Sequence, residues 1–239
     1  MSLIMKHWLI ALLFSVAVFS CKKVTESPST LGLEDITSYC PMKVSKVFIY
    51  RIDSSNAVRG NFQTSYYLAK DSVVNTFTDN QGRTCYLIFR YLTDTLSSQP
   101  YQYNQSYYVA YDKNKVEFVD ANNRRFINLI NPVSAFTTWY GNSYIDSLQI
   151  SQNTSFAGWQ YQYTTINQPY TVIDSTYPNT ITILQDADSS AVIPSETYSV
   201  EVYAKGIGLI HKQIIDYFYQ SSGVEDGSFE LTMNLVSYK

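Results

Sequence analysis

Residues 229–235 read Phe-Glu-Leu-Thr-Met-Asn-Leu, in which apolar and polar side chains alternate without a break. Successive side chains of a β-strand point to opposite faces, so this stretch predicts a strand with one buried face and one face in water. Sheets that are covered on one side only are usually antiparallel. The stretch therefore predicts an antiparallel fold.

The same period of two extends upstream from this strand. Tyr198, Val200 and Val202 share one face of a predicted strand. Gly206 and Gly208 follow and predict a corner or bulge in the sheet. A long alternating face comes next and comprises Ile207, Leu209, His211, Gln213, Ile215, Tyr217 and Tyr219.

Further strands are predicted along the rest of the chain, where β-branched and aromatic residues form short runs between turn residues. These runs cover residues 47–54, 73–78, 84–92, 107–111, 115–119, 125–130 and 159–163. Residues 133–156 are less regular and predict either a short helix or a long loop. Roughly ten to twelve strands with little helix predict an all-β meander that forms a curled sheet, a half-barrel or a closed barrel.

The composition fits one folded domain, which we place at residues 33–239. Apolar residues make up 45% of the 239 residues and charged residues only 15%, which excludes a disordered chain. The formal net charge is −3 and no run of Lys or Arg occurs, so we expect no nucleic-acid partner.

Residues 1–20 have the parts of a signal peptide, with Lys6 before an apolar run at 8–18. A run of about 11 apolar residues is too short to cross a bilayer, which needs roughly 20. The Val-Phe-Ser-Cys sequence that ends at Cys21 resembles the lipobox of bacterial lipoproteins, in which the cysteine is acylated and becomes the first residue. The alternative is ordinary secretion without acylation of Cys21.

Acylation would anchor the mature chain to the membrane through its N-terminus. We expect several acyl chains, palmitate among them, on Cys21, because stable anchoring needs at least two. Residues 21–32 are polar and rich in Ser, Thr and Pro, so they predict a lipidated, flexible tether.

Two further cysteines, Cys40 and Cys85, lie in the mature chain. An exported protein meets an oxidising compartment, where a disulfide persists. A bridge between them would close a loop of about 45 residues and stabilise the fold by roughly 4 kcal/mol. The alternative is that Cys85, which lies in an apolar run, is a small core residue.

Known catalytic and metal-binding motifs are missing from the sequence. His211 is the one histidine of the mature chain, and a lone histidine on an alternating strand is usually structural. Residues 186–190 resemble part of a calcium loop but lack its glycine and closing glutamate, so they predict a solvated turn. We therefore expect no catalytic residue, no metal, no cofactor and no enzyme activity.

Aromatic residues give the one hint of a binding function. Trp159, Tyr161 and Tyr163 share a face of a predicted strand, and Trp139 and Tyr140 lie in the irregular segment. If exposed, these rings could stack on sugars or line an apolar cavity. The alternative is packing in the core or a cross-strand aromatic ladder.

Several stretches resemble a family of Bacteroidota-type envelope lipoproteins to which no activity is assigned; they are residues 39–44, 48–54, 78–84, 125–133, 139–142 and 201–212. The resemblance implies lipoprotein export and a β-rich domain. Surface-exported members of that group tend to carry acidic residues after the cysteine, whereas Lys22 and Lys23 follow here. This favours the periplasmic face of the outer membrane. Three tripeptides resemble an O-glycosylation sequon of that group, although Asp-Ser and Asp-Thr pairs are also ordinary turn residues; they are Asp71-Ser72-Val73, Asp94-Thr95-Leu96 and Asp146-Ser147-Leu148.

Three functions from different classes remain open on the sequence alone. The first is a membrane-anchored, non-catalytic binding module for a glycan, lipid or other small ligand. The second is a structural or accessory subunit of an outer-membrane complex, and the third, least favoured, is a hydrolase. An enclosed apolar cavity would favour the first, a flat exposed apolar patch the second, and a cleft with paired carboxylates the third.

Overall fold

The computed structural model describes residues 35–96, 99–145, 158–190, 195–221 and 223–239. The expected signal peptide, Cys21 and the tether lie outside these residues. The described residues belong to one compact unit. None of the described segments forms a helix with the length and apolar content needed to cross a bilayer.

The described residues form one short helix and thirteen strands. They are α2 (Ile36–Tyr39), β1 (Val47–Val58), β2 (Asn61–Thr78), β3 (Thr84–Asp94), β4 (Gln102–Tyr111), β5 (Lys115–Val119), β6 (Arg125–Ile130), β7 (Thr138–Tyr140), β8 (Gln160–Val172), β9 (Ser175–Ser190), β10 (Ser195–Ala204), β11 (Gly208–Gln220), β12 (Gly223–Val224) and β13 (Phe229–Tyr238).

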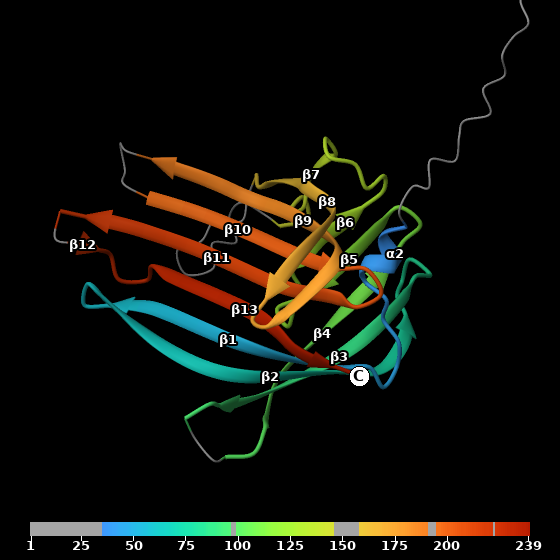
Figure 1. Cartoon of the computed structure of the whole chain (residues 1–239), viewed down its shortest axis with the longest axis horizontal. Helices are drawn as coiled ribbons and strands as arrows, with labels where there is room; N and C mark the ends of the chain where they lie inside the picture. The colour runs from blue at the N-terminus through green and yellow to red at the C-terminus, as the bar shows by residue number, and fades with distance from the viewer. Residues whose placement is uncertain (1–34, 97–98, 146–157, 191–194, 222) are drawn as a thin grey trace, which may run out of the picture. The chain divides into compact units, whose positions relative to one another are not determined.

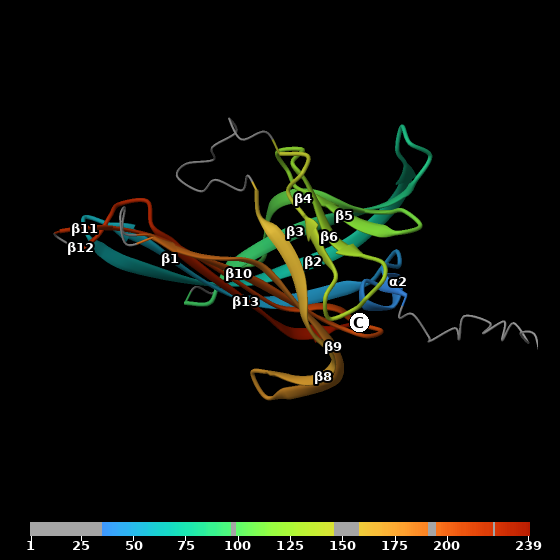
Figure 2. The same cartoon turned by 90° about the horizontal axis from the view of Figure 1, so that it is seen from above.

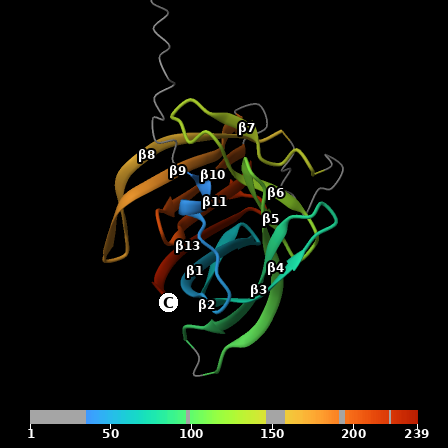
Figure 3. The same cartoon turned by 90° about the vertical axis from the view of Figure 1, so that its right-hand side faces the viewer.

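All of these strands belong to one antiparallel sheet (Figure 1). Their order is β6-β5-β4-β3-β2-β1-β13-β11-β10-β9-β8-β7, and β12 pairs with β11. Figure 3 views the sheet from the end that α2 covers, and the strands surround an interior there. Figure 2 shows the β8–β9 hairpin projecting away from the rest of the sheet.

The two edge strands, β6 and β7, meet along a seam that nearly closes the sheet into a barrel. The N–H of Ile127 donates to the carbonyl oxygen of Gly141 over 2.8 Å. Beside it, Nε1 of Trp139 donates to the carbonyl oxygen of Ile127 over 2.7 Å. The predicted antiparallel, all-β architecture is therefore confirmed, with almost no helix.

Apolar residues converge on the interior because they recur at every second position. Phe48, Tyr50 and Ile52 of β1 are buried, and β13 places Leu235 and Met233 opposite the last two. The polar residues of β13 alternate with this apolar set. The one-sided strand predicted at residues 229–235 is thus present.

The β2–β3 hairpin turn shows how local sequence sets the register. Oδ1 of Asp79 accepts hydrogen bonds from the backbone N–H groups of Gln81 and Arg83, and Oδ2 accepts from Nε of Arg83. Gly82 has a φ of +74°, which suits a residue without a Cβ. Residues 120–124 make the β5–β6 turn with the same contacts.

The structure bears on three local expectations, and one of them, the turn at residues 186–190, is wrong. Gly206 and Gly208 have positive φ; Gly206 lies in the β10–β11 turn, Gly208 begins β11, and the pairing of these two strands has a bulge close by, between Val202 and Tyr203. Residues 186–190 continue β9, because pairing with β10 overrides the turn preference of Asp and Ser. Within the irregular segment 133–156, residues 133–145 form the expected loop apart from the three-residue strand β7, and residues 146–156 lie outside the described residues.

Candidate functional site

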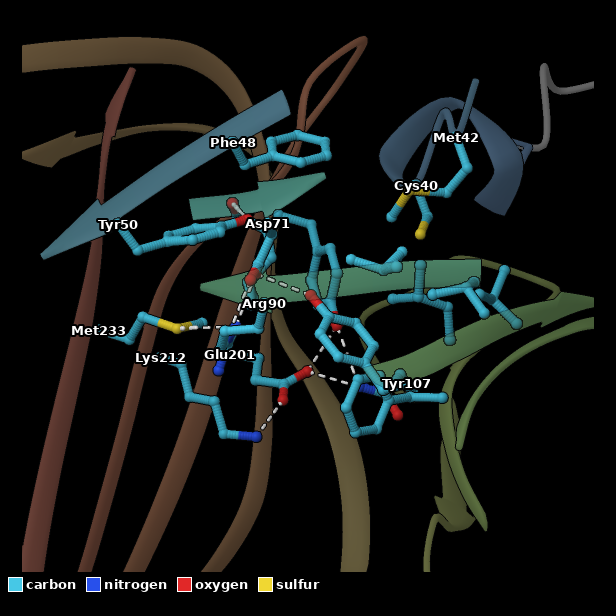
Figure 4. A pocket seen from close by; sticks show the side chains of 18 of the residues that line it. Cys40, Met42, Phe48, Tyr50, Asp71, Arg90, Tyr107, Glu201, Lys212 and Met233 are labelled. Atoms are coloured by element: carbon cyan, nitrogen blue, oxygen red, sulfur yellow. Dashed lines mark hydrogen bonds and ion pairs between the residues drawn. The ribbon is translucent and has the colours of Figure 1, made fainter. Parts of the chain in front are cut away.

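A cavity of about 190 Å³ lies inside the barrel (Figure 4). Its walls come from β1 to β6, β10, β11 and β13, together with the chain just after α2. Most of the lining is apolar and includes Phe48, Ile88, Val109, Leu129 and Met233. The interior therefore offers a largely apolar space with a few polar groups in its wall.

The helix α2 closes one end of this interior. Asp35 caps the helix, since its Oδ1 accepts a hydrogen bond from the N–H of Thr37 over 3.0 Å. Ile36 and Tyr39 are fully buried, and the hydroxyl of Tyr39 donates to Oδ1 of Asn167 over 2.7 Å. The chain thus folds its first described turn onto the barrel as a plug.

An ion pair between Arg90 and Asp71 occupies one wall of the cavity. Nε of Arg90 lies 2.7 Å from Oδ1 of Asp71, and Nη2 lies 2.6 Å from Oδ2. The hydroxyl of Tyr107 donates to the same Oδ2 over 2.7 Å. Burial alone would lower the pKa of Arg90, but the Asp71 carboxylate outweighs burial and raises this pKa. Arg90 therefore stays protonated at neutral pH.

A second ion pair, between Lys212 and Glu201, lines the same cavity (Figure 4). Nζ of Lys212 lies 2.7 Å from Oε1 of Glu201. Oε2 of Glu201 accepts hydrogen bonds from the hydroxyl of Tyr203 and from Nδ2 of Asn128. Burial opposes ionisation of Glu201, but the charge and hydrogen bond of Lys212 outweigh burial and lower the pKa of the carboxyl.

Asn128 brings an unsatisfied acceptor to the same place. The residue is 9% exposed, and its Nδ2 donates to Oε2 of Glu201 over 3.0 Å and to the hydroxyl oxygen of Tyr203 over 3.1 Å. Oδ1 of Asn128 is buried and has no hydrogen-bond partner among the described residues. Flipping the amide would not give Oδ1 a donor, because it would turn Oδ1 toward the Glu201 carboxylate, which only accepts hydrogen bonds.

A second cavity of about 180 Å³ adjoins the first. The two cavities share the lining residues Phe118, Asn128, Glu201, Lys212 and Ile214. The second cavity is also lined by Asp120 and Arg124 of the β5–β6 turn. Asn128 and the Glu201–Lys212 pair therefore mark the junction of the two spaces.

The five aromatic residues proposed as ligand contacts are mostly core residues. Trp139, Trp159, Tyr161 and Tyr163 are buried, whereas Tyr140 is 58% exposed and does not join them. The ring centroid of Trp139 lies 5.7 Å from that of Tyr161 and 4.9 Å from that of Tyr163. Core packing thus explains the row, although Trp159 and Tyr161 also line the second cavity.

Cys40 and Cys85 are both buried free thiols, so the disulfide alternative is wrong for this structure. Cys40 lines the first cavity beside α2. Cys85 alternates with Tyr86 on β3, whose even-numbered residues Ile88 and Arg90 line that cavity, so its side chain lies on the other face. A core role for Cys85 therefore holds. Burial raises the pKa of the Cys40 thiol to about 11.

Asp71 is 1% exposed, so the proposed glycosylation sequon at Asp71-Ser72-Val73 has its carboxylate committed to Arg90. A cluster of carboxylates lies elsewhere: partial burial raises the pKa of Asp186 to about 6, and the charges of Asp188 and Asp216 add to the effect. None of these three aspartates lines either of the two cavities.

His211 lies on the face of β11 opposite Lys212. Its Nδ1 is 2.6 Å from Oδ1 of Asn234, and its ring packs against Tyr170. The described ranges hold no group of three or more His, Cys, Asp or Glu residues placed to bind a metal ion.

Sequence reasoning missed the polar residues of the cavity. Their signal was a charge inside an apolar run, as for Arg90 between Phe89 and Tyr91, or Glu201 between Val200 and Val202. A buried charge needs a partner, so such positions are candidates for paired groups in an interior.

Two solved structures match most of the chain. One is a predicted exported protein of Bacteroides fragilis with a YmcC-like fold, at 8% identity and a TM-score of 0.40. The other is a predicted lipoprotein of Parabacteroides distasonis, at 10% identity and a TM-score of 0.43. In each case the match covers 82% of this chain and 96% of the other.

A LolA superfamily protein from Nitrosomonas europaea is similar at 8% identity and a TM-score of 0.19, over 86% of this chain and 90% of the other. No protein-family model matches the chain. No curated protein matches it either.

Proposed function

We propose that the protein is an exported lipoprotein whose barrel binds a small, largely apolar ligand without catalysing a reaction on it. The cavity of about 190 Å³ carries this proposal. An apolar cavity of roughly 150 Å³ in a protein core is large enough to bind benzene. The cavity here is larger, and its few polar groups would orient a bound molecule.

The polar groups of the cavity favour binding over catalysis. Arg90 is neutralised by Asp71, and Lys212 by Glu201. A general base or a nucleophile must present a reactive atom to the substrate, and these charges are already committed to each other. The proposal therefore assigns the interior to recognition alone.

Binding of the neutral dye N-phenyl-1-naphthylamine tests this function. The mature polypeptide from Lys22, exported with a signal that lacks a lipobox, keeps acyl chains out of the assay. We expect saturable binding that Leu231→Trp weakens at least about tenfold, because Leu231 lines the cavity. Val236→Trp is the matched control on the same strand, since Val236 is 48% exposed. Unsaturable binding, or equal binding by both variants, would contradict the proposal.

The lipid anchor is tested separately. Replacing residues 1–21 with the same secretory signal removes Cys21, the proposed lipid acceptor. We expect the protein to move from the membrane to the soluble periplasmic fraction, with stability unchanged within roughly ±0.5 kcal/mol. Protease added to intact cells then separates the periplasmic face of the outer membrane, which we propose, from the cell surface.

One observation supports a second candidate, an accessory subunit of an outer-membrane complex. On the face opposite the cavity, the rings of Phe62 and Tyr217 lie 5.1 Å apart, and Phe62 is 39% exposed. Exposed apolar surface of this kind can bind a protein partner. Membrane retention of the lipid-free protein after a salt wash, lost on Phe62→Ser, would favour this candidate over ligand binding.

A further inference from the structure

The charges that line the two cavities cancel in pairs. Arg90 lies 2.6 Å from Asp71, and Lys212 lies 2.7 Å from Glu201. In the wall of the second cavity, Arg124 also pairs with an acid of its own turn. Each cation has its own carboxylate, so the described lining leaves no net charge for a ligand to neutralise. A charged head group would enter without compensation, which is unfavourable in a buried site.

The junction of the cavities lacks one hydrogen-bond donor. Both hydrogens of the Asn128 amide are used by Glu201 and Tyr203, and this fixes the orientation of the amide. Oδ1 of Asn128 then remains without a donor. A buried acceptor in this position favours a ligand that carries an O–H or N–H group.

A hydrogen-bond donor with spare capacity lines the same junction of the two cavities. Lys212 and Asn128 bind the two oxygens of one Glu201 carboxylate, Lys212 at Oε1 and Asn128 at Oε2. An ammonium has three hydrogens, and the bond to Oε1 of Glu201 uses one of them. A ligand hydroxyl at the junction could therefore donate to Asn128 and accept from Lys212.

We propose that the interior binds an uncharged amphiphile whose head group carries a hydroxyl. The hydroxyl occupies the junction between Asn128 and Lys212, and the apolar tail lies along Ile88, Val109 and Leu129 in the first cavity. This inference rests on the proposed function and specifies the chemical class of the ligand.

Competition against the bound dye tests the hydroxyl and the charge separately. The competitors are 1-octanol, its isomer 1-methoxyheptane, which has no O–H, and octanoate, which is charged at neutral pH. We expect 1-octanol to displace the dye from the lipid-free protein at a concentration about tenfold lower than either of the others. A factor of ten is the size of effect that one well-placed hydrogen bond produces.

Two matched variants assign the effect to a residue. Asn128→Leu removes the acceptor at similar volume, and should make 1-octanol and 1-methoxyheptane equal competitors while the dye still binds. Asn131→Leu is the control, because Oδ1 of Asn131 is also buried without a partner but the residue lines neither cavity. This control should keep the preference for the alcohol.

The outcomes separate this inference from the function on which it rests. If the dye does not bind saturably, the proposed binding function fails. If the dye binds but the two isomers compete equally with the unaltered protein, the hydroxyl inference is overturned and the binding function stands. Tighter competition by octanoate than by 1-octanol would overturn the uncharged ligand. The comparison of isomers needs no variant, so poor folding of Asn128→Leu does not block the test.

Discussion

Arg90 and Asp71 form a bidentate ion pair inside the barrel, on the directly paired strands β3 and β2. Asp71 is 1% exposed, and Tyr107 donates a third hydrogen bond to its carboxylate. A pair of this kind holds each charge in place only as long as the partner is present. The loss of stability on removing the pair is therefore expected to depend on whether one or both residues are replaced.

Asp71→Leu alone should lower the free energy of unfolding by about 3–5 kcal/mol, because it leaves the Arg90 charge buried without a partner. The double variant Asp71→Leu with Arg90→Met should be more stable than this single variant. Urea denaturation measures both. Asp53→Leu is the control, since Asp53 pairs with an exposed Arg51 at the surface, and it should change the urea midpoint little. A double variant less stable than Asp71→Leu would contradict this account of the pair.

The free thiols predict that reductant does not affect stability. Cys40 and Cys85 are unbridged, so the lipid-free protein should unfold at the same urea concentration with and without dithiothreitol. Because both thiols are buried, a thiol reagent should modify them only as the protein unfolds. A midpoint that falls on reduction would show that the two cysteines are bridged in solution.

Gly141 predicts a steric limit at the seam of the barrel. A Cβ at this position would lie 2.3 Å from the ring of Tyr161. Gly141→Ala should therefore cost about 1–3 kcal/mol, the usual cost of overpacking a core. In a Tyr161→Leu background the same substitution should cost less, because the ring is gone. Urea denaturation measures both costs. Equal costs in the two backgrounds would show that the ring of Tyr161 is not what makes alanine unfavourable at position 141.

Substitution should affect stability differently at two glycines of the β10–β11 hairpin, Gly206 in its turn and Gly208 at the start of β11. Gly206 has a φ of +78°, which asparagine tolerates, whereas Gly208 has a φ of +126°, where side chains are rarely accommodated. Gly208→Asn should cost about 1–3 kcal/mol, and Gly206→Asn clearly less. Thermal unfolding of the two variants checks the order. A reversed order would mean that the turn adopts other dihedral angles in solution.

Replacing Asp186 with a neutral residue is expected to raise stability in a pH-dependent way. Its pKa is raised by burial from 3.8 to about 6, so ionisation weakens the folded state as pH rises through this range. Asp186→Asn should raise the free energy of unfolding by about 1 kcal/mol above pH 7, after allowance for solvent screening, with the gain declining toward pH 4. Asp174→Asn, at an exposed turn position, is the control and should show no such trend. A gain independent of pH would rule out the ionisation of Asp186 as its cause.

Sequence alone determined the features that depend on neighbours along the chain. The alternation at residues 229–235 identified a one-sided strand, because side-chain direction in a strand follows from residue parity. The β2–β3 turn at Asn80-Gln81-Gly82 could also be recognised, because the contacts that hold it span only a few residues of sequence. The apolar run before Cys21 is a local property too, and the lipid anchor predicted from it stays a prediction.

Tertiary structure decided which of these faces meet. Arg90 and Asp71 are 19 residues apart, and Asn128 and Glu201 are 73 apart, so only strand order and register bring them together. Alternation shows that a strand has two faces but does not say which one faces the interior of a barrel. The row of Trp159, Tyr161 and Tyr163 was therefore ambiguous until the seam between β6 and β7 placed it in the core. The polar junction of the two cavities exists because a nearly closed sheet folds distant, individually ordinary residues onto one interior surface.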